Sequence, residues 1–421
     1  MLLKMAIRNV LRHKRRTFIT VFTMAVGLMF FVFFDSLFVG IDSMLAETLV
    51  KYTDSAITIY SLEYDKNKKA FPLNKNIKDV EKITQLAKAF PEVEAIANRT
   101  QFLGEIAYFG KSKYIVGTVI DPIEDAKTFE IKESIREGKY FNDNDENEVL
   151  IGSYLAKELG ISVGETITII SRTKYETHNA VDYVVIGLIN SPSPVINETG
   201  VFVSFKGAER LLNLEGNITA MHIKVRWNKG ESIPSFAKKV ENVAKSLEEK
   251  LSDYKVYSFM DIFGDFLLLM KQKRVSSFIM IFLMLLIAGV GIVNTILMAV
   301  YERIKEIGVL IAMGLKPKEI RKLFLLEGAV LGVIGGIAGI ILGFLANLLL
   351  INYGYNLEAI FGGSVSGTEL GMPVWGTIYG QWNIAAYIIS FCFAFFTALI
   401  SAYIPARYAS KLHATDCLRF V

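Results

Sequence analysis

YERIKEIGVLIAMGLKPKEIRKLFLLEG, residues 301–328, is the stretch that decides the fold. A segment of mixed polar and apolar residues runs to Gly314, and glycine commonly follows the last residue of a helix. Pro317 comes next, and proline is favoured in the first turn of a helix. The stretch therefore predicts a short helix that ends near Gly314 and a second helix that begins at Pro317 and continues into a long apolar run.

Four apolar runs are each long enough to cross a bilayer, which takes about 20 residues of helix. Two of them flank the opening stretch, at Val275–Tyr301 and Gly328–Leu357, and a third lies at Leu370–Ala406. The run Thr17–Phe34 is too long and too rich in phenylalanine for a cleaved signal peptide, so we expect an uncleaved anchor. Since 52% of the residues are hydrophobic, we predict an α-helical membrane protein with four transmembrane helices, at 17–40, 275–300, 322–352 and 384–404.

The distribution of Lys and Arg predicts the orientation, because loops rich in these residues stay in the cytoplasm. The segment 1–16 carries Lys and Arg but no acid, the loop 301–321 carries more, and the loop 353–383 has neither. We therefore expect both termini, including the tail 405–421, on the cytoplasmic side. The segment 1–16 also places Leu3, Ile7 and Val10 on one helical face, as in a helix that lies along the membrane surface.

The charged region 41–274, between the first two spans, is predicted to be an external domain inserted between helices 1 and 2. Two parts of it show strand, helix and strand patterns in turn, the first from Ser55 to Val119 and the second from Ala220 to Ser258. Between these parts lie mostly strand-like runs, at 148–151, 166–171, 181–189 and 201–204. We therefore expect an α+β domain that is split by a mainly β insert.

The short helix in the opening stretch has an apolar face, which holds Ile304, Ile307 and Ile311. Glu302 with Lys305, and Arg303 with Glu306, are spaced to form ion pairs three residues apart. Such a helix is suited to a groove on a cytoplasmic protein. The alternative is a loop helix that packs only on its own membrane domain.

The third predicted span carries a ladder of small residues, which lets helix backbones approach closely: Gly328, Gly332, Gly335, Gly336, Gly339 and Gly343. We expect a packing seam there, within the subunit or with a partner permease. Asp35 is a polar residue near the outer end of the first span, and the aromatic residues Phe34, Phe38, Phe263 and Phe266 accompany it where the spans meet the external domain. These residues are a candidate substrate cleft, with helix packing as the alternative.

Nothing in the sequence indicates catalysis or a metal site. The four histidines are scattered, and no zinc-protease, esterase or paired-cysteine motif is present. GEIAYFGKS, Gly104–Ser112, has glycines six positions apart where a phosphate loop needs five, so we predict a β-turn at Gly110–Lys111. We expect no nucleic-acid partner, although the net charge of +4 alone argues neither way.

Several quoted stretches resemble one membrane protein family. EIGVLIAMG, followed by KPKEI and LEG, resembles the FtsX-type permease signature, and MAIRNVLRHKRRTFIT resembles the start of MacB- and LolC/LolE-like permeases. The external pieces EVLIGSYLAKELGISVGETITI, YVVIGLINSP and VFVSFKGAERLL are similar to the MacB-type periplasmic core. The ending SAYIPARYASKLHATDCLRF is similar to the family's PA-x-x-A and LR pattern, although His413-Ala414-Thr415 stands where a proline is common.

The resemblance implies a permease subunit of an ABC exporter in a bacterial inner membrane, which is no enzyme itself and leaves ATP and magnesium to a separate cytoplasmic ATPase. The coupling residues would be Glu302, Arg303, Glu306, Ile307, Gly308 and Gly314. The expected partners are that ATPase and a second permease, either an identical copy or a paralogue. The arrangement favours release of lipoproteins to a periplasmic chaperone or adaptor. MacB-like efflux of peptides or drugs, and a signalling or scaffolding protein, remain alternatives.

Overall fold

The computed structural model describes residues 2–262 except 13, 143–146 and 229–230, then 264, 301–356, 377–411 and 417, and part of 275–300: 275, 279, 282–283, 286, 290, 293–294, 296–298 and 300. Contacts divide the chain into two compact units. The helical unit comprises residues 1–42, 269–355 and 378–421, and the sheet unit comprises residues 43–268 and 356–377.

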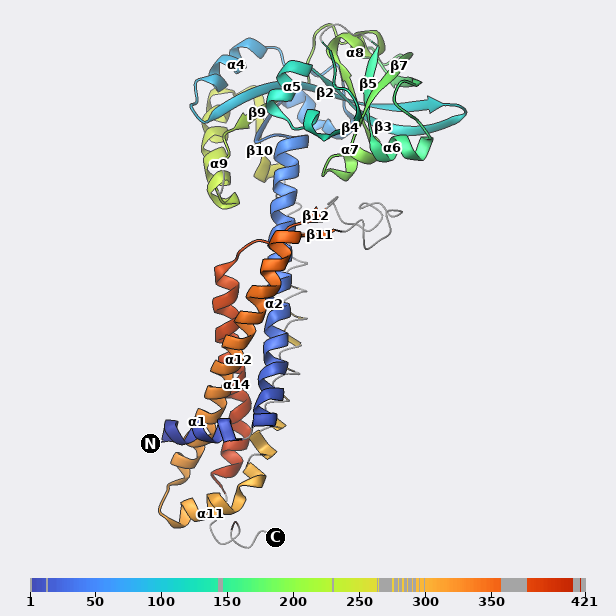
Figure 1. Cartoon of the computed structure of the whole chain (residues 1–421). Helices are drawn as coiled ribbons and strands as arrows, with labels where there is room; N and C mark the ends of the chain where they lie inside the picture. The colour runs from blue at the N-terminus through green and yellow to red at the C-terminus, as the bar shows by residue number, and fades with distance from the viewer. Residues whose placement is uncertain are drawn as a thin grey trace. The chain divides into compact units, whose positions relative to one another are not determined.

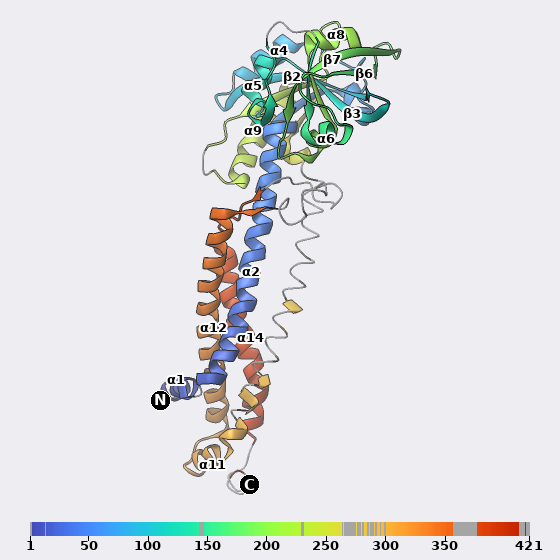
Figure 2. The same ribbon diagram turned by 45° about the vertical axis from the view of Figure 1, so that its right-hand side comes forward.

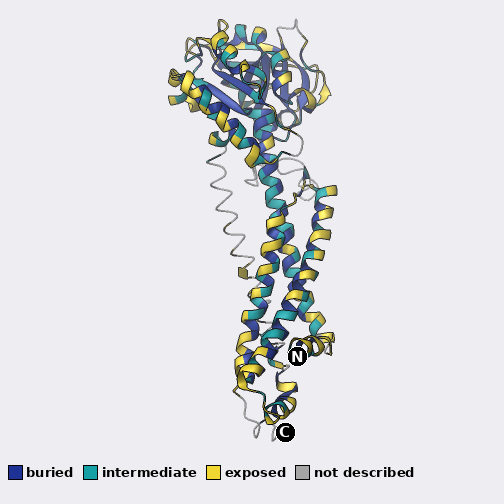
Figure 3. Ribbon diagram, turned by 90° about the vertical axis from the view of Figure 1, so that its left-hand side faces the viewer, coloured by how far each residue is buried: buried dark blue, intermediate teal, exposed yellow. Residues whose placement is uncertain are grey.

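Long apolar helices build the helical unit. The helices whose bounds are described there are α1 (Leu2–Arg12), α2 (Lys14–Thr48), α11 (Ile304–Ala312), α12 (Pro317–Tyr353) and α14 (Ile384–Ala409). Within this unit α2, α12 and α14 run side by side (Figures 1 and 2). Exposed residues line their outward sides, as Figure 3 shows, and many of these are large and apolar, such as Ile337, Ile341 and Phe344 on α12. Exposed apolar faces of this kind suit contact with lipid.

Three helices among the described residues are long and apolar enough to cross a membrane: Thr17–Thr53, Pro317–Tyr353 and Ile384–Ala409. The helices α2 and α12 extend beyond the spans expected at 17–40 and 322–352, while α14 begins at the expected residue 384. Most of the expected span 275–300 lies outside the described residues. The described residues within it are all helical.

The glycine ladder of α12 lies on two faces, and each face packs on another helix of the same chain. A Cβ atom added at Gly332 or Gly336 would lie within 3.0 Å of α14, at Ala398 and Phe391 respectively. A Cβ added at Gly339 would lie 2.6 Å from Leu28 of α2. Gly328 likewise faces α14, and Gly335 and Gly343 face α2. The glycines therefore bring the backbone of α12 close to both neighbours at once.

One mixed sheet organises the sheet unit. Its order is β10-β1-β9-β2-β3-β8-β5-β7-β4, and β6 pairs with both β2 and β7. The strands are β1 (Ile57–Ser61), β2 (Val93–Tyr108), β3 (Lys111–Ile120), β4 (Ile135–Gly138), β5 (Glu148–Gly152), β6 (Thr166–Arg172), β7 (His178–Ile189), β8 (Gly200–Ser204), β9 (Ala220–Val225) and β10 (Tyr254–Ser258).

Short helices surround the sheet: η1 (Leu49–Thr53, a π-helix), α3 (Leu62–Lys66), η2 (Lys68–Ala70), α4 (Val80–Lys88), α5 (Pro122–Thr128), η3 (Lys132–Ser134), α6 (Ser153–Leu159), α7 (Pro194–Thr199), α8 (Phe205–Leu212) and α9 (Ile233–Lys250). The core beneath the sheet holds large side chains such as Phe102, Ile169 and Tyr183. Two two-residue strands, β11 (Tyr355–Asn356) and β12 (Thr377–Ile378), form a separate small sheet.

The insert expected within the external domain is part of this sheet rather than a separate layer. β3 pairs in parallel with β8, and β5 pairs in parallel with β7. β5 and β8 are buried along their whole length, as is usual for strands covered on both faces. The insert also contains α6 and α8, which the sequence patterns did not predict. The turn between β2 and β3 lies at Phe109 and Gly110, where both φ angles are positive, one residue before the predicted turn.

Candidate coupling site

The short helix α11 has clear start and stop signals. It ends at Ala312, and Gly314 has a φ of 96°, which a residue with a side chain rarely adopts. The amide of Leu315 donates to the carbonyl of Leu310 at 3.1 Å, and so closes the last turn. Pro317 then opens α12, and the Glu319 carboxylate accepts a hydrogen bond from the Lys316 amide at 2.8 Å. The two helices predicted from this stretch are therefore present.

The two faces of α11 have different surroundings. Ile304 and Ile307 are only 4% and 3% exposed, and Gly308 is also buried. Ile307 packs among the apolar side chains of the helical unit. On the opposite face Val309 is 49% exposed and Met313 is 69% exposed. The isoleucine face therefore packs within its own chain, as the loop-helix alternative expects. The open face carries Val309, Ala312 and Met313, with Lys305 and Glu306 beside them.

A buried polar cluster holds the start of α11 in place. Arg303 and Glu327 form an ion pair at 3.2 Å, and both side chains are less than a tenth exposed. Asn9 of α1 donates from Nδ2 to Glu327 Oε1 at 2.6 Å, and its carbonyl accepts from Arg303 Nη2 at 3.3 Å. The cluster therefore joins α1, α11 and α12 through residues far apart in the sequence.

One of the two ion pairs expected within the short helix forms differently. Arg303 pairs with Glu327 rather than with Glu306, because its side chain points into the helical unit. Glu306 lies 3.6 Å from Arg12 of α1, and both side chains are largely exposed. A pair of this kind contributes little to stability. Arg12 and Glu306 nevertheless lie beside the open face of α11.

The coupling residues carried over from the family resemblance thus fall into two groups. Glu302, Glu306 and Gly314 are exposed, whereas Arg303, Ile307 and Gly308 are buried within the chain. Asn9 and Glu327 were not singled out from the sequence, although Glu327 is the last charged residue of α12 before its long apolar run. A lone acid at the start of an apolar helix is a signal that could have pointed to this cluster.

The candidate substrate cleft is only partly described. Phe34, Asp35 and Phe38 lie on α2, each partly buried, while Phe263 and Phe266 lie outside the described residues. Asp35 Oδ2 accepts a hydrogen bond from Asn383 Nδ2 at 2.7 Å. The rings of Phe34 and Phe30 stack at 6.3 Å between centroids. Asp35 therefore joins the C-terminal half of α2 to the start of α14, as the helix-packing alternative expects.

A second polar network links the same helices and was not predicted from the sequence. Asn347 of α12 is fully buried. Its Oδ1 accepts from the Ser36 hydroxyl of α2, and its Nδ2 donates to the Tyr387 hydroxyl of α14 at 3.0 Å. Each of the three long helices therefore contributes a polar group to one network, which fixes their register.

The sheet unit carries a hollow of about 690 Å³, which is a usual size for a ligand pocket. It lies where β2 stops pairing with β9 and starts pairing with β6. Leu103 and Tyr114 line it and are 51% and 80% exposed. Among the described residues, no group of His, Cys, Asp and Glu side chains is placed to hold a metal ion. The hollow therefore offers apolar surface at Leu103 and Tyr114 beside polar and charged lining residues such as Arg172 and Glu176.

Comparisons with known proteins agree on one family. A model described as the MacB-like periplasmic core domain matches residues 17–243, and a model described as the FtsX-like permease C-terminal matches residues 278–414. An uncharacterized ABC transporter permease of Methanocaldococcus jannaschii, MJ1507, is 25% identical over 98% of this chain and 96% of its own length.

Two further relatives have more specific names. The lipoprotein-releasing system transmembrane protein LolC of Neisseria meningitidis is 24% identical over 71% of each chain. The macrolide export ATP-binding/permease protein MacB of Haemophilus ducreyi is 32% identical over 32% of this chain, and this chain covers 17% of that protein. The chain therefore belongs to the family of ABC transporter permeases that combine a MacB-like periplasmic core domain with an FtsX-like permease C-terminal domain.

Proposed function

We propose that this chain is a permease subunit that receives motion from a separate cytoplasmic ATPase and passes it to an external domain, and that this motion releases lipoproteins from the inner membrane. The observation that carries the proposal is the two-sided environment of α11. Its inner face is fixed to α1 and α12 through Arg303 and Glu327, while Val309 and Met313 are exposed on its outer face. A partner that pushes on the outer face would move α1, α11 and α12 together.

The proposed topology has four spans, with both termini and α11 in the cytoplasm and residues 41–274 outside. The helical state of the described residues within 275–300 supports a fourth span beside the three candidates. The absence of Lys and Arg from residues 353–383 supports an external position for that loop. A dimer with a second permease, identical or paralogous, completes the proposed assembly.

Release of lipoproteins is the substrate proposal, and its support is the LolC relative, which is similar over most of this chain. Efflux of peptides or drugs is the second candidate, supported by the MacB relatives. Depletion of the chain from its own host distinguishes the two. The first proposal predicts that lipoproteins accumulate in the inner membrane. The second predicts that only the resistance of the host to drugs or peptides decreases.

Co-purification tests the coupling proposal. The tagged chain is purified in mild detergent as wild type, as Glu306→Lys and as Val309→Asp, and ATP hydrolysis and the bound proteins are measured. The matched control is Glu241→Lys, a charge reversal at a similarly exposed glutamate on α9. We expect an ATPase with the wild type and the control, and loss of the ATPase or of its regulation in the α11 variants, because the substitutions alter only the open face.

Two results would contradict the proposal. One is that no ATPase co-purifies with the wild type, and the other is that both α11 variants retain it with unchanged activity. Either result would favour a membrane-anchored signalling or scaffolding protein, whose external domain binds a partner without transport.

A further inference from the structure

The backbone carbonyls that follow the first long helix are hydrogen-bonded to other elements of the sheet unit. After Thr48 the chain winds into the π-helix η1, where the amide of Asp54 donates to the carbonyl of Leu49 at 2.9 Å. The last four carbonyls of a helix have no partner within it and must find one elsewhere. Here the carbonyls of residues 51–54 all find partners on other elements of the sheet unit.

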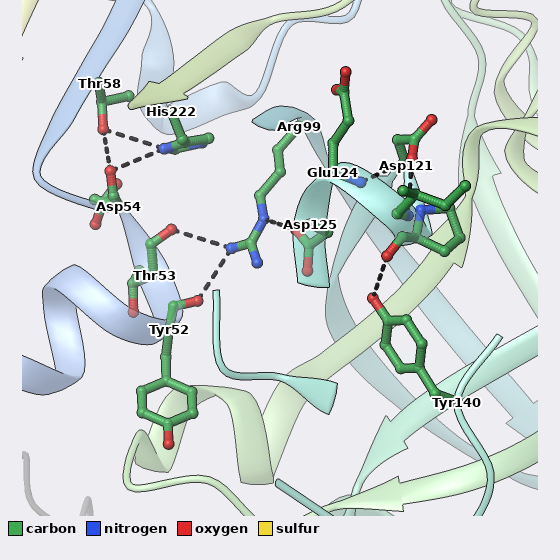
Figure 4. Close-up of polar contacts among 12 residues, drawn as sticks. Tyr52, Thr53, Asp54, Thr58, Arg99, Asp121, Glu124, Asp125, Tyr140 and His222 are labelled. Atoms are coloured by element: carbon green, nitrogen blue, oxygen red, sulfur yellow. Dashed lines mark hydrogen bonds and ion pairs between the residues drawn. The ribbon is translucent and has the colours of Figure 1, made fainter. Parts of the chain in front are cut away.

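Arg99 of β2 provides the central attachment (Figure 4). Its Nη1 donates to the carbonyls of Tyr52 and Thr53, at 3.0 and 3.2 Å. Its Nε donates to Asp125 Oδ1 of α5 at 2.7 Å, and the guanidinium lies 3.2 Å from the ring centre of Phe129. Arg99 is 2% exposed, and Asp125 is fully buried. The planar guanidinium is therefore held by an acid and a ring while it binds the helix end.

The neighbouring carbonyls are attached to other parts of the sheet unit. The carbonyl of Asp54 accepts from the Thr58 hydroxyl of β1 and from His222 Nδ1 of β9, the latter at 2.9 Å. The carbonyl of Lys51 accepts from the Glu130 amide at 2.9 Å. The strands β1, β9 and β2 are adjacent in the sheet. One helix end is thus tied to three neighbouring strands by side chains from each of them.

The buried charges of Arg99 and Asp125 carry a desolvation penalty, which apolar side chains at the same positions would not carry. Burial of an ion pair is weak as a source of stability, because desolvation offsets the attraction between the charges. Arg99 Nη2 and Asp125 Oδ2 even lack hydrogen-bond partners among the described residues. What the buried guanidinium provides, through Nε and Nη1, is a fixed geometry between the elements that it joins. The cluster is suited to hold the helix end rigidly against the strands.

We propose that Arg99 is a positioning residue of the coupling mechanism, which fastens the end of α2 and η1 to β1, β9 and β2 so that displacement of the helix moves the sheet. The inference rests on the proposed function, because it assigns the place where motion of a membrane helix enters the external domain. Thr58 and His222 are its auxiliary contacts. The helix end then moves with the strands as one body instead of unwinding or sliding under load.

The test compares complexes of full-length chain and co-purified ATPase, reconstituted in lipid nanodiscs. Hydrogen–deuterium exchange is measured without nucleotide and with magnesium, ATP and vanadate. The variants are Arg99→Lys, which keeps the charge but loses the planar donors, and Thr58→Val, which keeps the shape but loses one bond to the helix end. The control is Tyr183→Phe, which removes a buried hydroxyl bond to the Gly207 carbonyl elsewhere in the sheet unit.

We expect nucleotide to change exchange in peptides from β1, β9 and β2 in the wild type and in Tyr183→Phe. In Arg99→Lys and Thr58→Val most of that difference should be lost, while ATPase binding and ATP hydrolysis remain, because the partner's site is untouched. A merely structural role would lower the melting temperature and leave the nucleotide-dependent difference in place.

The outcomes separate the inference from the proposed function. If the wild type shows no nucleotide-dependent change in the external domain, the proposed function fails and the inference fails with it. If the wild type responds and both variants respond equally, the inference alone is overturned. If Arg99→Lys does not fold, the milder variant Thr58→Val is compared with the control Tyr183→Phe, and that comparison decides the question.

Discussion

At the scale of single residues, the buried pair Arg303–Glu327 is the contact on which the proposed coupling site depends most. Glu327→Gln leaves the Arg303 charge buried without its counter-ion, and loss of one partner of such a pair costs about 3–5 kcal/mol. We therefore expect a clearly lower melting temperature for the purified chain in detergent. Glu306→Gln, at the exposed pair with Arg12, should change stability by less than about 1 kcal/mol.

The double variant Arg303→Met with Glu327→Leu tests the reason for that loss. It removes both charges and fills similar space, so it should recover most of the stability that Glu327→Gln loses. Equal melting temperatures for wild type and Glu327→Gln would show that the pair does not hold α11 to α12. The double variant then has nothing to restore.

We expect the free energy of unfolding to depend on pH because of His222. Burial, and next the charge of Arg99, lower the pKa of His222 from 6.5 to about 3. The unfolded chain binds a proton near its ordinary pKa, but the folded chain does not. The contribution of His222 to the free energy of unfolding is therefore fully present above about pH 6.5 and is lost as the pH falls towards 3. The loss is roughly 3 kcal/mol over the first two pH units.

Asp54 acts in the opposite direction, and the experiment must separate the two groups. Burial raises the pKa of Asp54 to about 6, so its protonation favours the folded state as the pH falls below that value. Melting temperatures of wild type and His222→Gln are compared between about pH 7 and 4.5, with Asp54 present in both. The prediction is confirmed if the melting temperature depends less steeply on pH in His222→Gln, but not in a variant at the exposed His178. Identical slopes contradict it.

At the scale of elements, the glycine faces of α12 determine how closely the three long helices pack. A side chain at Gly339 would meet Leu28 of α2 at 2.6 Å, and excess volume in a packed core costs about 1–3 kcal/mol. We expect Gly339→Leu to lower the melting temperature and to broaden the gel-filtration peak. Val333→Leu adds volume at a position of α12 that is 36% exposed, and should leave both unchanged. Similar behaviour of the two variants would show that α2 and α12 do not pack closely.

The elements themselves were largely predictable from the sequence. Strand alternation placed β6 and β10 within one residue of their observed bounds, and Gly314 with Pro317 marked the break between α11 and α12. The periodicity of α11 identified its apolar face correctly, but periodicity does not say which protein covers that face. The isoleucines pack on their own chain, and the open face is the opposite one.

The contacts that define the candidate sites could not be predicted from the sequence patterns. Asn9 and Glu327 are separated by 318 positions, and Tyr52 and Arg99 by 47, so no local spacing brings them together. The helices α6 and α8 were missed because stretches of seven and eight residues are shorter than the window over which a helical period can be recognised among strands. Local patterns therefore predicted the elements, whereas the polar clusters depend on how distant elements pack.

At the scale of the whole molecule, the proposed topology places α11 and the external domain on opposite sides of the membrane. In a background with Cys392 and Cys417 replaced, Met313→Cys and Phe109→Cys offer exposed labelling positions in α11 and in the β2–β3 turn. An impermeant thiol reagent should label Phe109→Cys in intact cells or spheroplasts and Met313→Cys only after permeabilisation. Labelling of both from the same side contradicts the topology.

The most direct test of the central claim is photo-crosslinking from α11 in native membranes. A benzophenone amino acid replaces Met313, which is 69% exposed, and in a matched chain it replaces Ile304, which is 4% exposed. The account predicts that the probe at position 313 crosslinks to an ATPase subunit, while the probe at position 304 crosslinks only within its own chain. Absence of any ATPase crosslink from position 313, with normal levels of the chain in the membrane, would contradict the claim that α11 receives the motion of an ATPase.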